Sequence, residues 1–486
     1  MTCNATRGQT TSPGQKLVAF QITRRFVGQA RRLLFFLVGA ASVSLSLQLQ
    51  SYAQNAPEQV TPDTKTYAIT DPIADKGGQV AVNVKAFGAT GDGMTNDTAA
   101  FNAALRSLTA SGGGVCLVPK GTYIISASGL TVPYTPAVSS DTHLLGEGRG
   151  VSILKVNGMP RTHLLQCDGD YWSVENLTFD MGNYTPSVGL TAIACKGNHW
   201  RVSNCTIVKS GRWGIAAFGG NNWSIERNYI SRTVPGARPA TGAILVTASA
   251  GVWSSHGRVI NNVCEGAGIT FSGSDGIIAR NQVDRSGFGS GIFVQGLPST
   301  HSLTITGNIC SGGSSGFDAA QEGRWWSVNG FEIWAPDSVI YNNIAHDNDG
   351  GGFAIGGQNS IVVGNKAYNN GRGRAGYAGF NARVNPARGA TASHSIFIGN
   401  FAYAQDYGYA EQPGGLTDIK HFENDYNRNR IGPAKYSSAG DQPAAQGSRT
   451  IQMRISPEMK NKLKALAEDA DMPDIARRGV RECLSR

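Results

Sequence analysis

The sequence predicts an all-β solenoid of short stacked strands, a parallel β-helix, and two observations carry this prediction. One template recurs irregularly: an apolar residue, two variable positions, an asparagine, and an apolar or small residue two positions later. Its seven asparagines, spaced 19 to 35 residues apart, are Asn228, Asn262, Asn281, Asn308, Asn343, Asn365 and Asn400. The segments are also β-branched, alternate with period two, and are separated by many of the 63 glycines. Tight corners between strands need such glycines, whereas stacked helices do not.

The recurring asparagine predicts an inward turn position. Asparagine accepts the left-handed backbone conformation, and its amide can bond to the asparagine one coil above. Two earlier segments, 174–179 and 202–207, fit the template with Leu177 and Cys205 in the asparagine slot. We therefore expect a ladder of amides along one corner of the solenoid.

The N-terminal residues predict export. Four arginines from Arg24 to Arg32 precede an apolar run at 33–43 and small residues at 51–53, as in a cleaved signal peptide. An uncleaved anchor is the alternative, but the apolar run is short for a membrane span. We expect residues 1–53 to be a signal peptide and 54–79 a linker. The product would be periplasmic or secreted, without stable membrane association after cleavage.

Charge and cysteine content exclude several function classes. Residues 1–53 hold six basic and no acidic side chains, and residues 449–486 hold nine basic and six acidic ones. Residues 54–448 therefore carry no net charge, so we expect no nucleic acid bound to the main body. One of the eight cysteines precedes the signal, which leaves an odd number and no disulfide framework. No cysteine–histidine spacing typical of zinc occurs.

Residues 82–123 resemble a known family. Their sequence, VNVKAFGATGDGMTNDTAAFNAALRSLTASGGGVCLVPKGTY, is similar to the opening of pectate-lyase-superfamily proteins, particularly of the rhamnogalacturonase and epimerase type. That superfamily includes polysaccharide hydrolases, lyases, uronate epimerases and phage tailspikes. The resemblance implies a right-handed parallel β-helix over residues 80–436.

The same segment predicts a helix that caps the solenoid. Asn96 or Asp97 can cap it. Its buried face is expected to consist of Phe101, Ala104, Leu105 and Leu108. Such a helix covers the open end of a solenoid, where the core would otherwise meet water.

The C-terminal residues differ in composition. After a linker at 437–448, residues 449–486 predict a strand at 450–455, a helix opening at Ser456, and a second helix from about Asp474. This order resembles ribbon-helix-helix DNA-binding modules, which implies that Gln452 and Arg454 would face the major groove. A small dimerising or solvated tail is the alternative, because an exported protein meets no operator DNA.

Aligned repeats predict a surface column of chemically active side chains. Parallel coils stack about 4.8 Å apart, so residues at one offset form a ladder. The residue beyond the second apolar slot is, in successive coils, Asp180, Val208, Ser231, Glu265, Asp284, Ser311, His346, Tyr368 and Tyr403. Such a column would line a groove suited to a polymer, although outward positions of any solenoid are often polar because they are wet.

This column and the inserted segment at 316–334 supply the candidate site residues. The catalytic candidates are Asp284, Asp318, Glu322, His346, Asp347 and Asp349, because carboxylate pairs serve glycosidases and histidine serves proton abstraction. The substrate-binding candidates are Arg285, Arg324, Trp325, Trp326, Tyr368 and Tyr403, because guanidinium groups bind uronates and aromatic rings bind sugars. Catalytic motifs of polygalacturonases and uronate epimerases are absent, so no role is transferred by motif.

The sequence thus favours an exported enzyme that degrades a polysaccharide, with an acidic polysaccharide as its partner. A glycoside hydrolase and a polysaccharide lyase both remain open. A non-catalytic glycan-binding surface β-helix is the alternative. No metal site and no cofactor are predicted, although calcium is possible.

Overall fold

A computed structural model describes most of the chain from Val80 to Ser485. The described ranges are 80–126, 137–158, 163–182, 190–231, 242–249, 251–286, 289–314, 317–318, 324–325, 328–372, 377–385, 389–414, 416–435, 457–470, 472 and 474–485. They all belong to the compact unit Pro72–Arg486. The predicted signal peptide and first linker lie outside these ranges, as does the strand predicted at 450–455.

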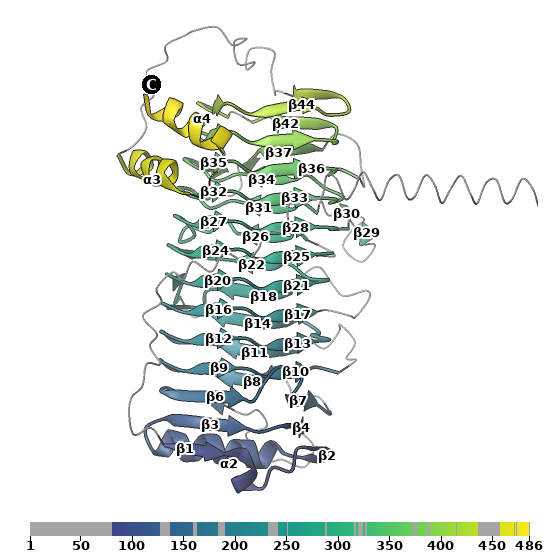
Figure 1. Cartoon of the computed structure of the whole chain (residues 1–486), viewed down its shortest axis with the longest axis vertical. Helices are drawn as coiled ribbons and strands as arrows, with labels where there is room; N and C mark the ends of the chain where they lie inside the picture. Colours follow the sequence, from purple (N-terminus) through teal and green to yellow (C-terminus); the bar gives the residue numbers. More distant parts are fainter. Residues whose placement is uncertain are drawn as a thin grey trace, which may run out of the picture. The chain divides into compact units, whose positions relative to one another are not determined.

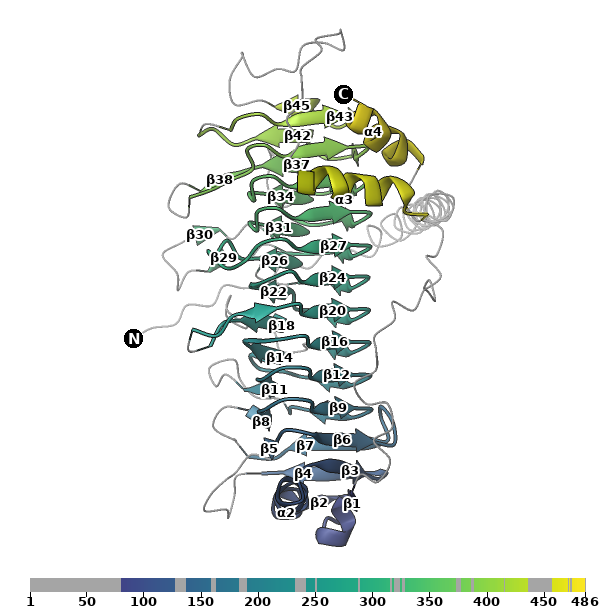
Figure 2. The same ribbon diagram turned by 90° about the vertical axis from the view of Figure 1, so that its left-hand side faces the viewer.

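The described chain winds repeatedly through three long parallel sheets, here called A, B and C, in that order within each coil (Figures 1 and 2). Sheet A consists of β1 (Ala81–Asn83), β3 (Gly114–Val118), β6 (Thr142–Gly146), β9 (Ser173–Glu175), β12 (Arg201–Ser203), β16 (Ser224–Glu226), β20 (Arg258–Ile260), β24 (Ile277–Ala279), β27 (Thr304–Thr306), β32 (Val339–Tyr341), β35 (Ile361–Val363), β40 (Ile396–Ile398) and β43 (Lys420–Phe422).

Sheets B and C complete each coil. Sheet B consists of β2 (Asp92–Asn96), β4 (Gly121–Ile125), β7 (Ser152–Val156), β10 (Thr178–Asp180), β13 (Thr206–Val208), β17 (Tyr229–Ser231), β21 (Val263–Glu265), β25 (Gln282–Asp284), β28 (Ile309–Ser311), β33 (Ile344–His346), β36 (Lys366–Tyr368), β41 (Phe401–Tyr403) and β44 (Asp425–Arg428). Sheet C consists of β5 (Ala137–Val138), β8 (His163–Cys167), β11 (Thr191–Cys195), β14 (Trp213–Phe218), β18 (Gly242–Thr247), β22 (Ile269–Phe271), β26 (Ile292–Val294), β31 (Phe331–Ile333), β34 (Phe353–Ile355), β37 (Ala378–Ala382), β42 (Tyr407–Glu411) and β45 (Gly432–Lys435).

Three small sheets decorate the corners. One is parallel and contains β15 (Gly220–Asn221), β19 (Ser254–Ser255) and β23 (Gly273–Ser274). The other two are antiparallel pairs, β29 (Phe317–Asp318) with β30 (Arg324–Trp325), and β38 (Val384–Asn385) with β39 (Ala390–Thr391).

The repeated template spans two strands rather than one. In the coil that contains Asn343, Ile340 is the middle residue of β32, and Ala345 is the middle residue of β33. Both are fully buried, because the middle residue of each three-residue strand points into the core. The asparagine lies at the corner between the two strands. A single apolar core runs inside the coils from Val84 to Tyr426.

The predicted amide ladder is confirmed and extends one coil further, to Asn424. Each side-chain amide donates to the next side-chain oxygen at 2.9 to 3.1 Å. The expectation that these asparagines adopt the left-handed conformation is wrong. That conformation falls on the preceding residue, such as Asn342 with φ 54°. The ladder asparagines instead use their amides, since Asn343 also donates to the Ile305 carbonyl at 2.8 Å.

The buried cysteines behave as small apolar residues. Cys205, Cys264 and Cys310 are fully enclosed, and none of the described cysteines forms a disulfide. Burial raises the pKa of Cys205 and of Cys264 to about 12. These thiols are therefore neutral and unreactive at ordinary pH.

The predicted capping helix is α2 (Thr98–Ala110), which follows the short 3₁₀ helix η1 (Val84–Phe87). It lies at the N-terminal end of the coil stack (Figure 1), and the four predicted apolar residues are buried. Asp97 occupies the N-cap position but makes no capping bond. Its carboxylate instead accepts the Thr90 amide at 2.8 Å, and Asn96 accepts the Thr98 amide at 3.2 Å.

The two predicted C-terminal helices are α3 (Pro457–Glu468) and α4 (Asp474–Ser485). They pack on the outer face of sheet A beside the last coils (Figures 1 and 2). Their apolar cluster consists of Val339, Ile361, Val363, Ile396, Ile398, Phe422, Leu463, Leu466, Met472, Ala476, Val480 and Cys483. Arg478 forms an ion pair with Glu423 at 2.8 Å. The apolar faces of both helices are thus occupied by the solenoid itself.

Candidate functional site

The predicted surface column exists on sheet B. Strand pairing places its nine residues at successive levels, at the third position of each strand: Asp180, Val208, Ser231, Glu265, Asp284, Ser311, His346, Tyr368 and Tyr403. From β28 to β41 the middle residue of each strand is buried while the third is partly exposed. Alternation in short strands therefore aligns these side chains on the outer face.

Three rings of this column form a continuous stack. The centroids of His346 and Tyr368 are 4.8 Å apart with an interplanar angle of 1°, and those of Tyr368 and Tyr403 are 5.1 Å apart at 12°. Because the rings face one another along the stack, their edges point outward. The stack therefore offers an imidazole nitrogen and phenol hydroxyls rather than aromatic faces.

His346 is held by a carboxylate at its own level. Its Nδ1 lies 2.7 Å from Oδ2 of Asp347, and roughly a quarter or less of each side chain is exposed. The hydrogen bond from His346 lowers the pKa of Asp347, although burial opposes this shift. In the tautomer that donates from Nδ1 to this carboxylate, Nε2 carries no proton.

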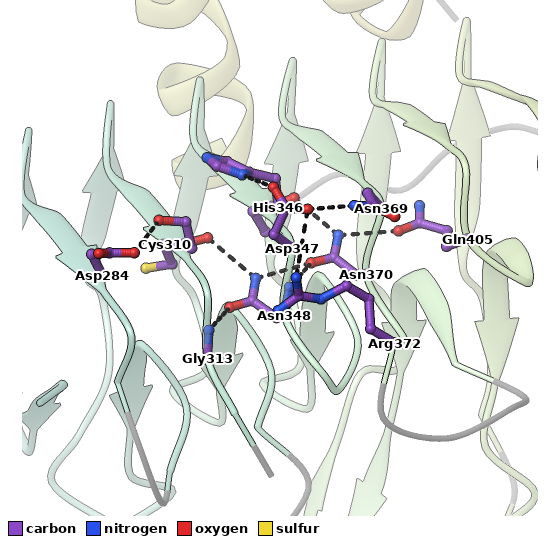
Figure 3. A network of polar contacts seen from close by, with 12 residues as sticks. Asp284, Cys310, Gly313, His346, Asp347, Asn348, Asn369, Asn370, Arg372 and Gln405 are labelled. Carbon is purple, nitrogen blue, oxygen red and sulfur yellow. Dashed lines mark hydrogen bonds and ion pairs between the residues drawn. The ribbon is translucent and has the colours of Figure 1, made fainter. Parts of the chain in front are cut away.

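Two further groups support Asp347 (Figure 3). Asn369 donates from its amide to Oδ1 of Asp347. Arg372 lies between two carboxylates, 3.9 Å from Asp347 and 3.7 Å from Asp349. Its side chain is 42% exposed, which leaves part of the guanidinium accessible to a ligand. Sequence reasoning named neither Asn369 nor Arg372 among the site residues.

Asp284 and Arg285 form a separate cluster. Arg285 Nε lies 2.8 Å from Asp284, which also accepts the Ser311 hydroxyl at 3.1 Å. Asp284 lies two levels from His346 in the column, a separation of roughly 10 Å. The structure thus brings His346, Asp347, Asp349, Tyr368 and Tyr403 together but places Asp284 and Arg285 at a different point of sheet B.

The inserted segment lies at the corner between sheets B and C, between β28 and β31. There, Asp318 on β29 pairs with Arg324 on β30, next to Trp325. The structure describes only the backbone of these three residues, and Glu322 and Trp326 lie outside the described residues. The connection that contains this segment starts after Ser311 in β28, one level from His346.

The described residues contain neither a metal-binding cluster nor a membrane span. Within them, no group of three or more histidine, cysteine, aspartate or glutamate side chains is arranged to hold a metal ion. None of the described helices is long and apolar enough to cross a membrane.

Two family models match the chain. Residues 81–170 match "Rhamnogalacturonase A/epimerase, pectate lyase-like", and residues 191–329 match "Right handed beta helix region". The predicted right-handed parallel β-helix and the pectate-lyase-like N-terminal segment are therefore confirmed. The comparisons give no support to the ribbon-helix-helix resemblance of the tail.

Relatives from Azotobacter vinelandii match a short segment. Mannuronan C5-epimerase AlgE2 is 39% identical over 74 residues, which are 15% of this chain and 7% of that protein. Alginate lyase 7 is 36% identical over 74 residues, 15% of this chain and 9% of that protein. The chain thus matches less than a tenth of the length of these two relatives.

Solved structures share the fold at low sequence identity. The A-module of mannuronan C-5 epimerase AlgE6 from Azotobacter vinelandii has a TM-score of 0.55 at 18% identity, covering 73% of this chain and 97% of that one. The Dettilon tailspike protein has a TM-score of 0.54 at 16% identity, covering 74% of this chain and 68% of that one. The surface adhesin PfbA of Streptococcus pneumoniae has a TM-score of 0.53 at 15% identity, covering 71% of this chain and 90% of that one.

Proposed function

We propose that this chain is an exported lyase that cleaves an acidic polysaccharide by removing the proton at C5 of a uronate residue. One observation carries the proposal: His346, oriented by Asp347, stands beside Tyr368 and within the same corner as the Arg372 guanidinium. Two relatives of the N-terminal segment, a mannuronan C5-epimerase and an alginate lyase, bear names that concern uronate polymers. The proposal of export rests on residues 24–53, in which four arginines precede an apolar run and small residues.

In the proposed reaction, Nε2 of His346 takes the C5 proton. The electron pair forms the C4–C5 double bond while the bond from C4 to the glycosidic oxygen breaks. The Tyr368 hydroxyl donates a proton to that oxygen as it leaves. Arg372, and Lys366, which is exposed on the same strand as Tyr368, would bind the uronate carboxylate and stabilise charge that develops on it.

Elimination is favoured over epimerisation by the arrangement of acid and base. Epimerisation must return a proton to C5 from the face opposite to the base. His346 and Tyr368 stand side by side in one column, so a polymer lying on sheet B would meet both from the same face. A base at C5 and an acid at the leaving oxygen can act from one side.

Hydrolysis is the second candidate, favoured by one observation on the same column. Glu265 and Asp284 lie at adjacent levels, about 4.8 Å apart, near the separation of a retaining carboxylate pair. However, Glu265 accepts the Tyr229 hydroxyl at 2.8 Å, and Asp284 is paired with Arg285. Both carboxylates are thus engaged, whereas the bond to Asp347 occupies Nδ1 of His346 and a quarter of that side chain is exposed.

The test incubates the full chain with mannuronate, guluronate, galacturonate and glucuronate polymers. Ultraviolet absorbance of unsaturated ends, total reducing ends and the C5 configuration are followed together. Absorbance and reducing ends that rise together would support a lyase. Reducing ends alone would indicate the hydrolase, and inverted C5 without cleavage would indicate an epimerase. If none of the three signals changes but the chain binds the polymers, the result would indicate a glycan-binding protein.

The variant His346→Gln should reduce kcat by about 10²- to 10⁴-fold, because a general base contributes that much. His394→Gln is the matched control. His394 also bonds a carboxylate, Asp418, at 3.4 Å, but it lies outside the sheet B column. Equal activity of the two variants would contradict the assignment of His346.

A further inference from the structure

A second ladder of amides lies behind the candidate site, at the corner between sheets B and C (Figure 3). The Gly313 amide donates to Asn348 at 3.1 Å, Asn348 donates to Asn370 at 2.9 Å, and Asn370 donates to Gln405 at 3.1 Å. The three side chains are 0 to 1% exposed. Their hydrogen-bonding groups are therefore sealed from water and depend on one another.

Asn370 holds the chain on both sides of the His346–Asp347 dipeptide. Before it, the Asn370 amide donates to the Ala345 carbonyl at 2.9 Å. After it, the Asn370 oxygen accepts the backbone amide of Asn348 at 3.3 Å and its side-chain amide at 2.9 Å. One buried side chain thus fixes residues 345 and 348 relative to each other.

The dipeptide needs such support because Asp347 has a left-handed backbone, with φ 56°. A non-glycine residue in this conformation is strained and persists only where the surroundings determine it. If the corner relaxed, Asp347 would turn away from His346, and the imidazole would lose the bond that fixes its proton.

We propose that Asn370 is a positioning residue for the His346–Asp347 pair, acting through the backbone at 345 and 348. The inference rests on the proposed function of His346. The other groups around the imidazole are Tyr368, which stacks on it, Asn369 and Arg372, which contact Asp347, and Ser311 at the preceding level. Main-chain bonds also hold this segment, from the Asp347 amide to the Tyr368 carbonyl at 3.3 Å and from the Gly312 amide to the His346 carbonyl at 3.3 Å. Asn370 adds a buried side chain that bonds the backbone at both 345 and 348.

The chain contains a matched control in Asn365. It flanks the same strand, β36, at the opposite corner, and it is also 0% exposed. Its amide donates to Asn400 at 3.1 Å and to the Ile340 carbonyl at 2.9 Å, and its oxygen accepts the Asn343 amide at 2.9 Å. The bonds are equivalent, but their partners, residues 340, 343 and 400, are not candidate site residues.

The experiment compares Asn370→Ala with Asn365→Ala in the full chain labelled with ¹⁵N-histidine, with His346→Gln used to assign the His346 signals. Ring nitrogen shifts report which nitrogen carries the proton. We expect similar losses of melting temperature in both variants. In Asn370→Ala alone, His346 should change from the Nδ1-protonated form to a mixture, and kcat should fall on the order of ten-fold or more with KM unchanged.

Asn370→Gln should restore the tautomer and kcat, because Gln405 makes the same kinds of bond at the next level. If Asn370→Ala does not fold, the serine variants at 370 and 365 give the same comparison. An unchanged tautomer in the Asn370 variant, or an equal change in the Asn365 variant, would overturn the inference. The tautomer is read without substrate, so this result is separate from failure of the proposed activity.

Discussion

At the scale of single residues, two histidines show how environment sets chemistry. His346 stands at the surface with a carboxylate on Nδ1. His421 lies at the C-terminal coils, where part of its side chain reaches the surface but Nε2 is enclosed and unpartnered. Burial lowers the pKa of His421 to about 4 from an ordinary value of 6.5. The proton exchange proposed for the first histidine depends on its carboxylate partner, whereas burial keeps the second histidine neutral.

His421 predicts a pH dependence of stability. Its pKa is lower in the folded chain than in the unfolded one, so the unfolded state binds more protons between pH 6.5 and 4. Stability from this group should be full above pH 6.5 and decline by about 3 kcal/mol as the pH falls through 4, with no further decline well below 4. His421→Leu should remove this slope. Denaturant unfolding of both proteins at several pH values tests this, and parallel curves would contradict it.

At the scale of elements, the C-terminal helices act as part of the solenoid. The outer face of sheet A is apolar at the last coils, at Ile361, Val363, Ile396 and Ile398, and α3 and α4 cover it. Some coils further towards the N-terminus carry polar residues at the equivalent positions, such as Arg201 and Ser203, although β24 carries Ile277 and Ala279 there. The tail and the face it covers therefore match each other in composition.

Substitutions at two positions of α4 test how much this contact contributes to stability. Val480 is 0% exposed and Ile475 is 44% exposed. Val480→Asp places an unpaired carboxylate in the apolar contact and should detach the helices, at a cost of about 3 kcal/mol or more. Ile475→Asp should change stability by less than about 0.5 kcal/mol. Thermal unfolding and binding of a hydrophobic dye measure both, and equal behaviour would show that the contact contributes nothing.

At the scale of the whole molecule, each coil is stabilised by its contacts with the adjacent coils. Each coil contacts its neighbours, and α2 covers the first coil with buried Phe101, Leu105 and Leu108. In a solenoid, the loss of a cap exposes the first coil but leaves distant ones with both their neighbours. The effect of damage should therefore decline along the stack.

Leu105→Asp tests this gradient. The variant buries a carboxylate under the cap, so amide protection should fall first in β1, β3 and β4. Strands β33, β36 and β41 should keep the protection of the unmodified chain. Hydrogen exchange resolved by peptide measures the gradient, with Arg106→Asp, which alters an exposed position of the same helix, as the control. Uniform loss of protection would indicate that the coils unfold as one cooperative unit.

The sequence alone determined the repeat and its local consequences. A fixed offset within each coil is preserved by strand pairing, so the asparagine ladder and the column from Asp180 to Tyr403 could be aligned without coordinates. His346, Asp347 and Tyr368 were accessible in this way. The second ladder was accessible too, because Asn348, Asn370 and Gln405 each lie five residues after a template asparagine, although we did not predict it.

The tertiary structure decided the rest. Sheet C strands share a short repeat, a glycine followed by an apolar residue, as in Gly291–Ile292, Gly330–Phe331 and Gly352–Phe353. Loops of variable length separate this repeat from the asparagine template, so its offset from sheet B differs from coil to coil. Arg372 belongs to no repeated motif of the sequence. It contacts Asp347 and Asp349 because the corner after β36 brings it next to the preceding coil. Asp284 and Asp347 are both catalytic candidates from the sequence, but they belong to coils two levels apart. The sequence thus specifies contacts that repeat with the coil, whereas contacts made across corners depend on loop geometry that only the folded chain provides.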